Sequence, residues 1–196
     1  VNGLLPGSYL RYNPAMALRE LNGGDCKTWL AVAEKTREAV LIDPLLEKAS
    51  AQLELLRREG LRLALVVDTH THADHLSGAR WLRETAGVPV AMHEAARAAA
   101  VTRRLVDGET LSFGELAFKV LHTPGHTTDS VFLAGAGAFV TGDFLFLGAL
   151  GAGRLDLPGG DPGRHFASLA KVAALDGGLE VLPGHDYQNR ERSTLG

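Results

Sequence analysis

Hydrophobic residues along the chain follow two patterns, one typical of strands and one typical of helices. Short, dense apolar runs bounded by turn residues predict strands at 16–22, 28–34, 38–43, 61–68, 88–92, 110–121, 130–134, 137–141 and 179–182. Helical spacing of apolar residues predicts helices at 47–59, 76–87, 93–104 and 163–174. Leu53 and Leu56 share one face of the first helix, and Gly60 and Gly87 end the first two helices.

The order of these elements predicts the fold class. Strands and helices are mixed, and each half of the chain begins with stretches that look antiparallel. This order favours two sheets with helices outside them, an α+β (α/β) layered fold, over a simple doubly wound sheet. No internal repeat and no Pro/Gly/Ser linker divides the chain, so we expect residues 1–196 to form a single domain.

The polar residues with catalytic potential lie directly after apolar strands. THTHADH (69–75) follows LALVVD, HTPGHT (122–127) follows LAFKVL, TGD (141–143) follows AFV and PGHDY (183–187) follows LEVL. In open sheets the loops at the C-terminal ends of strands converge on a crevice where ligands bind. We therefore expect these four loops to assemble one site.

Histidine and aspartate dominate these loops. Within six positions of a chain that has eight histidines stand His70, His72, Asp74 and His75. Imidazole nitrogens and carboxylate oxygens are ligands for zinc, iron and manganese. In an extended loop His70 and His72 point the same way, and the tight turn at Pro124-Gly125 aims His126. The set predicts a metal site and leaves the identity of the metal open.

The composition narrows the functions open to the chain. Its net charge is −3 and no run has more than two basic residues, so we expect no nucleic-acid partner. No apolar run approaches the ~20 residues of a transmembrane helix, so we expect no membrane partner. The N-terminal stretch lacks the pattern of a signal peptide, which favours a cytoplasmic protein. The single cysteine, Cys26, allows no internal disulfide, and we expect a small buried side chain.

The motif HxHxDH, followed by His126 in HTPGHT, Asp143 in TGD and His185 in PGH, resembles the metallo-β-lactamase superfamily from about residue 16 to residue 187. The resemblance implies an αββα sandwich with metals at one edge. Carried over to this chain, the first metal position has His70, His72 and His126; the second has Asp74, His75 and His185; and Asp143 is the bridging carboxylate. It also implies that Asp74 and Asp143 are the catalytic carboxylates.

Several further motifs resemble the persulfide dioxygenases, also called sulfur dioxygenases, within this superfamily. They are THTHADHLSGA, CKTWLAVAEKTREAVLIDP, GRLD (153–156) and HDY (185–187). This resemblance implies one Fe(II) per chain, held by His70, His126 and Asp143, and oxidation of a glutathione-type persulfide with O₂ to sulfite and the free thiol. Two histidines and one carboxylate leave coordination sites open for sulfur and O₂. Arg154 and Tyr187 match positions implied to contact the glutathione part of the substrate.

Two alternatives remain. The first is a glyoxalase II-like hydrolase of thioesters, in which two Zn²⁺ ions hold a bridging hydroxide that attacks the thioester carbonyl. All seven superfamily ligands are present, as this reading needs, and LPGGD (157–161) resembles the short hydrolases of this kind. The second is an inactive metal-binding scaffold, which the complete ligand set disfavours. In both enzymatic alternatives the partner is a small thiol-derived substrate. We also expect a homodimer.

The remaining candidates have structural interpretations. We expect Trp29 and Trp81 in the core and His93 and His165 at the surface. Asp68 precedes the first histidine motif and is expected to orient a ligand histidine through a hydrogen bond. His122 opens the HTPGH turn, where we expect either a structural role or a hydrogen bond that supports a metal ligand.

Overall fold

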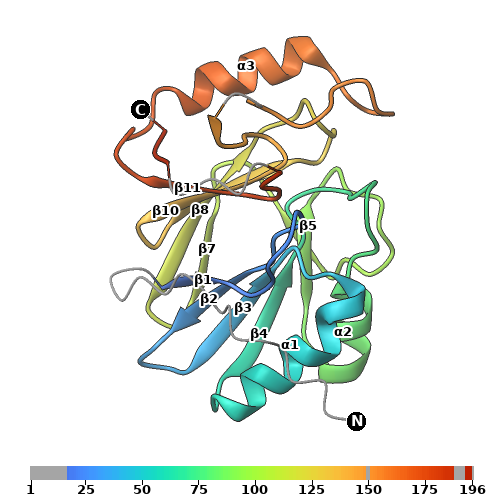
Figure 1. The fold of residues 1–196 in the computed structure, drawn as a ribbon, viewed down its shortest axis with the longest axis vertical. Coiled ribbons are helices and arrows are strands. Elements are labelled where there is room, and N and C mark those ends of the chain that lie inside the picture. The colour runs from blue at the N-terminus through green and yellow to red at the C-terminus, as the bar shows by residue number, and fades with distance from the viewer. Residues whose placement is uncertain (1–16, 149–150, 188–192, 196) are drawn as a thin grey trace.

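In a computed structural model of the chain, which describes residues 17–148, 151–187 and 193–195, two mixed sheets pack face to face (Figure 1). Helices α1 (Leu46–Arg58) and α2 (Ala79–Ala86) cover the outer face of one sheet, and α3 (Pro162–Val172) covers the other. This layering confirms the predicted αββα sandwich. The assignment of residues 1–196 to a single domain remains a prediction, and its residues 1–16 lie outside the described part.

The first sheet has the strand order β1 (Leu18–Glu20), β2 (Trp29–Ala33), β3 (Glu38–Ile42), β4 (Arg62–Val67), β5 (Val90–His93) and β6 (Arg103–Leu105). It is antiparallel from β1 to β3 and parallel from β3 to β6. The second sheet has the order β11 (Glu180–Pro183), β10 (Ala138–Gly142), β9 (Val131–Gly135), β8 (Leu116–His122) and β7 (Thr110–Phe113). Here only the β10–β11 pairing is parallel among the described strands.

Apolar side chains fill the space between each pair of layers. Val40 and Val67 of the first sheet meet Phe118 and Val131 of the second. Alternate residues of the same strands, such as Leu41 on β3, face α1 and α2 instead. Because both faces of these strands are covered, they read as continuous apolar runs in the sequence.

The prediction of a helix at 93–104 is wrong. His93 ends β5, and Arg103–Leu105 returns as a parallel partner of β5, so the chain between them runs through turns. The guanidinium of Arg104 donates to the carbonyl of Ala96 and helps to hold this return. Strand pairing therefore overrides the helix propensity of an alanine-rich segment.

Most other predicted elements are confirmed, with small shifts in their ends. The strand expected at 110–121 is instead the hairpin β7–β8, which turns at Gly114 with a φ of 49°. Gly60 and Gly87 follow α1 and α2 with φ values of 66° and 68°, in the left-handed region that favours glycine. No helix in the described segments has the length and apolar character needed to cross a membrane.

Trp29 links the two sheets. Its side chain is buried, as expected, and its indole Nε1 donates to the carbonyl of Pro183 at 3.0 Å, which connects β2 to the end of β11. Trp81 is only partly buried, against the outer cluster on α1 and α2. Since β11 leads directly into His185, the Trp29 bond supports the edge of the sandwich where the histidines lie.

We predict that Trp29→Phe lowers the free energy of unfolding by about 1–3 kcal/mol, because it leaves the buried carbonyl of Pro183 without its donor. Urea denaturation of the variant measures the change. Trp81→Phe is the matched control and should cost less, since its ring lies partly in solvent. Equal losses for the two variants would contradict a special role for the Trp29 bond.

Candidate metal centre

The loops after β4, β8, β10 and β11 meet at one edge of the sandwich, as the sequence predicts. They bring together His70 from the first sheet with His126 and Asp143 from the second. One ligand atom from each of these three residues lies within 4.8 Å of the other two. All three side chains are buried. This cluster contains the three residues of the predicted iron triad.

The hydrogen bonds of His70 fix which of its ring nitrogens carries the proton. The Thr69 hydroxyl donates to Asp43 Oδ2 at 2.8 Å, because a carboxylate can only accept. His70 Nδ1 lies 2.9 Å from the same hydroxyl and must therefore donate its proton to it. This leaves a lone pair on Nε2, which is buried and has no hydrogen-bond partner among the described residues.

His126 is fixed in the same tautomer by the backbone. Its Nδ1 lies 2.7 Å from the carbonyl oxygen of Arg154, which can only accept a proton. Gly153 makes this approach possible, because a Cβ at that position would lie 2.8 Å from His126 Nδ1. The lone pair of His126 therefore resides on Nε2, on the side of Asp143.

The two lone pairs point at one carboxylate. His126 Nε2 lies 3.6 Å and His70 Nε2 lies 3.9 Å from Asp143 Oδ2. Burial, together with the nearby charge of His72, holds the pKa of His70 well below its ordinary value, so this imidazole stays neutral. Electron-rich atoms that converge in a buried site need a cation between them. The donor set therefore fits a metal ion.

Asp43 orients the first histidine motif through hydrogen bonds. Its carboxylate accepts one from the Thr69 hydroxyl, one from the Thr69 amide at 2.6 Å and one from His72 Nε2 at 3.2 Å. Burial alone would lower the pKa of His72, but the charge of Asp43 and this hydrogen bond raise it to about 9. Asp43 is 1% exposed and has a φ of 53°, a left-handed conformation that is costly for a residue other than glycine. The hydrogen bonds that Asp43 makes in this position offset the cost of its backbone conformation.

Sequence reasoning assigned this orienting role to Asp68 and missed Asp43. Asp68 instead accepts a hydrogen bond from Ser77 at 2.7 Å, and burial raises its pKa to about 6. The signal for Asp43 was present, because LIDP places a carboxylate directly after an apolar strand, like the other site residues.

His185 lies between two carboxylates. Its Nδ1 is 2.7 Å from Asp143 Oδ1 and its Nε2 is 2.8 Å from Asp74 Oδ2. Burial opposes the charged form, but these two partners outweigh it and raise the pKa of His185 to about 11. The hydrogen bonds from His185 and His75 in turn hold the pKa of Asp74 well below its ordinary value. An imidazolium that donates from both nitrogens has no lone pair for a metal.

The second predicted metal position has an unexpected neighbour. The Cys26 sulfur lies 3.5 Å from Asp74 Oδ2 and forms a compact group with Asp74 and His75. Cys26 is half-buried, so the expectation of a buried packing side chain is wrong. An antiparallel bridge between Cys26 and His185 brings the residue to this edge.

The two predicted substrate contacts lie at the exposed rim of the site. Arg154 pairs with Asp156 through two hydrogen bonds, of 3.0 and 2.8 Å, and its side chain is 70% exposed. The Tyr187 ring stacks on His185, with 5.1 Å between the ring centroids. Tyr187 is 54% exposed, so one face of its ring is open to solvent.

His93 and His165 were expected at the surface and are buried instead, with 4% exposure each. His93 stacks on His122, with ring centroids 3.7 Å apart, and His122 Nε2 donates to the Thr128 carbonyl at 2.9 Å. This agrees with the structural role expected for His122. His165 turns inward from α3 and packs against Phe144 and Gly125, the glycine that precedes His126.

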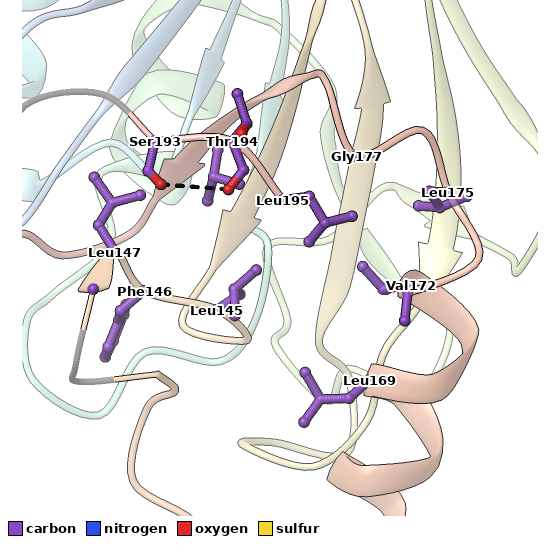
Figure 2. Close-up of a pocket in the computed structure, with 13 residues that line it drawn as sticks. Leu145, Phe146, Leu147, Leu169, Val172, Leu175, Gly177, Ser193, Thr194 and Leu195 are labelled. Atoms are coloured by element: carbon purple, nitrogen blue, oxygen red, sulfur yellow. Dashed lines mark hydrogen bonds between the residues drawn. The ribbon is translucent and has the colours of Figure 1, made fainter.

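An apolar pocket of about 400 Å³ lies between α3 and the segment that follows β10 (Figure 2). Leu145, Leu169, Val172 and Leu195 are among its lining residues. Its described lining contains no histidine, aspartate or cysteine, so it is separate from the metal-binding residues. Phe146 lies at its edge, and its ring centroid is 5.9 Å from that of His185.

The family model described as the Metallo-beta-lactamase superfamily matches residues 21–185. Mitochondrial persulfide dioxygenase ETHE1 of Bos taurus is 34% identical over 171 residues, which cover 86% of this chain and 66% of that protein. Hydroxyacylglutathione hydrolase of Anaeromyxobacter dehalogenans is 40% identical over 172 residues, which cover 86% of this chain and 64% of that protein. The chain thus spans slightly less than two thirds of the length of these relatives.

Solved structures show the same similarity. The crystal structure of ETHE1 from Myxococcus xanthus matches with a TM-score of 0.86 and 36% identity, covering 92% of this chain and 80% of that one. A protein solved in a di-iron-bound form matches with a TM-score of 0.73 and 32% identity, covering 91% of this chain and 94% of that one.

We predict that His185 of the metal-free protein stays protonated on both ring nitrogens at pH 9, because its pKa is raised from 6.5 to about 11. Its ion pairs therefore stabilise the fold fully below about pH 6.5 and lose that contribution as the pH rises through about 11. Long-range ¹H–¹⁵N NMR distinguishes the two protonation states, and His185→Asn identifies the signal. A neutral His185 at pH 8 would contradict the arrangement described here.

Proposed function

The chain belongs to the metallo-β-lactamase superfamily, and we propose that it is a persulfide dioxygenase with one Fe(II) per chain. The reaction converts a glutathione-type persulfide, O₂ and water into the free thiol, sulfite and two protons. The observation that carries the proposal is the triad of His70, His126 and Asp143, whose donor atoms converge in one buried cluster. Two histidines and one carboxylate with open positions are the ligand set of non-haem Fe(II) oxygenases.

The triad would hold iron through His70 Nε2, His126 Nε2 and Asp143 Oδ2. Bound there, Fe(II) would supply open positions at which the terminal sulfur of the substrate and O₂ meet. The surrounding residues keep the ligands in the required state. Asp43 and Thr69 hold the His70 tautomer, and the Arg154 carbonyl holds that of His126. These partners raise the basicity of both Nε2 atoms and so make them stronger metal ligands.

His185 links the two carboxylates of the site, and a second ion would bind it only by displacing the proton on Nε2. It shares its protons with Asp143 and Asp74, which leaves both carboxylates hydrogen-bonded and His185 charged. Asp74 then acts as a fixed negative charge at the open side of the site, where its side chain is 38% exposed. In this role Asp74 contributes to catalysis by holding the His185 cation against Asp143.

Arg154 and Tyr187 are the proposed contacts for the thiol part of the substrate. A guanidinium binds carboxylates through paired hydrogen bonds, as Arg154 already does with Asp156. A glutathione carboxylate would replace Asp156 as the partner of the Arg154 guanidinium. The exposed part of the Tyr187 ring would pack against the peptide part of the substrate. The partner remains a small thiol-derived molecule with no nucleic acid or membrane involved, and we propose a cytoplasmic homodimer.

A glyoxalase II-like thioester hydrolase with two Zn²⁺ ions is the second candidate. Its specific support is the 40% identity to a hydroxyacylglutathione hydrolase, together with the complete set of superfamily ligands. The group of Asp74 and His75 lies beside the triad, where a second ion would sit. Zinc binding by His185 would require it to give up the proton that it shares with Asp74.

We predict that the Fe(II)-loaded protein consumes O₂ on addition of glutathione persulfide and forms one sulfite for each O₂ consumed. His126→Ala should lower the rate at least ~100-fold, because loss of a direct ligand costs at least as much as loss of its outer partners. An oxygen electrode and sulfite analysis measure both quantities. His93→Ala removes a buried imidazole that is not a ligand and should retain the activity.

Failure of the iron-replete protein to consume O₂ with this persulfide would contradict the dioxygenase proposal. The zinc-loaded protein is then assayed with S-lactoylglutathione. Cleavage of that thioester, lost in His126→Ala and His75→Ala alike, would favour the hydrolase.

A further inference from the structure

We propose that Asp129 is a positioning residue that fixes the loop of His126 against the loop of His70, so that both imidazoles reach one metal ion. This inference rests on the proposed metal centre and deepens it. Asp129 lies within the segment HTTDS, three residues after His126, and is 2% exposed. Sequence reasoning did not single it out.

The carboxylate of Asp129 connects the two loops directly. On one side it accepts hydrogen bonds from the Thr71 hydroxyl at 2.6 Å and from the Thr71 amide at 3.3 Å. On the other side it accepts a hydrogen bond from the Thr127 hydroxyl at 2.6 Å. Thr71 stands between His70 and His72, and Thr127 directly follows His126. Oδ1 accepts from both threonines and Oδ2 from Thr71 alone, so every one of these bonds ends one residue away from His70 or His126.

The two loops come from different sheets, so no continuous strand pairing sets their separation. The His70 loop follows β4 of the first sheet, and the His126 loop follows β8 of the second. A backbone hydrogen bond from the Val131 amide to the Thr69 carbonyl at 2.8 Å joins their bases. Asp129 adds side-chain bonds on the far side of His70, at Thr71, and directly beside His126, at Thr127. It therefore constrains the distance between His70 and His126.

Ser168 provides a contrast within the same region. Its hydroxyl donates to the Pro124 carbonyl at 2.8 Å and is 5% exposed, so it holds the His126 loop on α3. Among the described residues, no hydrogen bond joins Ser168 to the His70 loop. Removing this bond loosens the loop on the helix but leaves the link between the two ligand loops in place.

Cobalt(II) is the probe for the test, because its visible spectrum reports ligand geometry. The dissociation constant and spectrum are measured for the native protein, Asp129→Ala, Asp129→Asn, Thr71→Val, Thr127→Val and the control Ser168→Ala. We expect Asp129→Ala to weaken Co(II) binding ~10–100-fold and to change the spectrum. Each threonine variant should have a smaller effect, and that effect should shrink when Asp129 is already alanine. Ser168→Ala should bind within about threefold of the native protein.

A purely structural role would lower the thermal midpoint of the metal-free protein but leave the Co(II) spectrum of the folded protein unchanged, and that result would overturn the inference. If Asp129→Ala fails to fold, Asp129→Asn and the threonine variants carry the test, and native-like Co(II) binding in all three would overturn it. Native protein that binds Co(II) no better than His126→Ala would instead overturn the metal centre itself, and the inference with it.

Discussion

The site depends on one physical constraint, which is that two imidazole lone pairs and a carboxylate must meet in a buried space. Each imidazole keeps its lone pair on Nε2 only because its Nδ1 proton has an acceptor, the Thr69–Asp43 pair for His70 and the Arg154 carbonyl for His126. Burial keeps His70 neutral. Without these partners either ring could rotate or protonate, and the buried cluster would lose its affinity for a cation.

The sandwich architecture explains why buried carboxylates recur around the centre. The proposed ligands come from two sheets that share a core but whose described strands are not paired with one another. Asp43 organises the loop of the first sheet, and Asp129 joins that loop to the loop of the second. His185, from the end of β11, holds Asp143 and Asp74 together. In the metal-free protein this imidazolium neutralises the two carboxylates, and a second ion would have to displace its Nε2 proton.

Local signals in the sequence were sufficient to predict most of the fold and the convergence of the loops that carry His70, His126 and Asp143, because apolar runs and the histidine motifs are each contained in a few residues. The prediction of a helix at 93–104 was wrong because the chain returns beside β5 and pairs with it there, and an alanine-rich sequence does not reveal this pairing. His165 was misplaced because its inward direction depends on how α3 packs over Gly125. Asp129 meets Thr71 and Cys26 meets Asp74 through contacts between segments 58 and 48 residues apart in sequence, which no local pattern reveals.

We propose that one iron ion binds between His70, His126 and Asp143. Crystals of the Fe(II)-loaded protein, grown without oxygen, test this by anomalous diffraction at the iron edge. We expect one anomalous peak per chain, within bonding distance of the two Nε2 atoms and the Asp143 carboxylate. A second peak of similar height beside Asp74 and His75, or no peak at the triad, would contradict it.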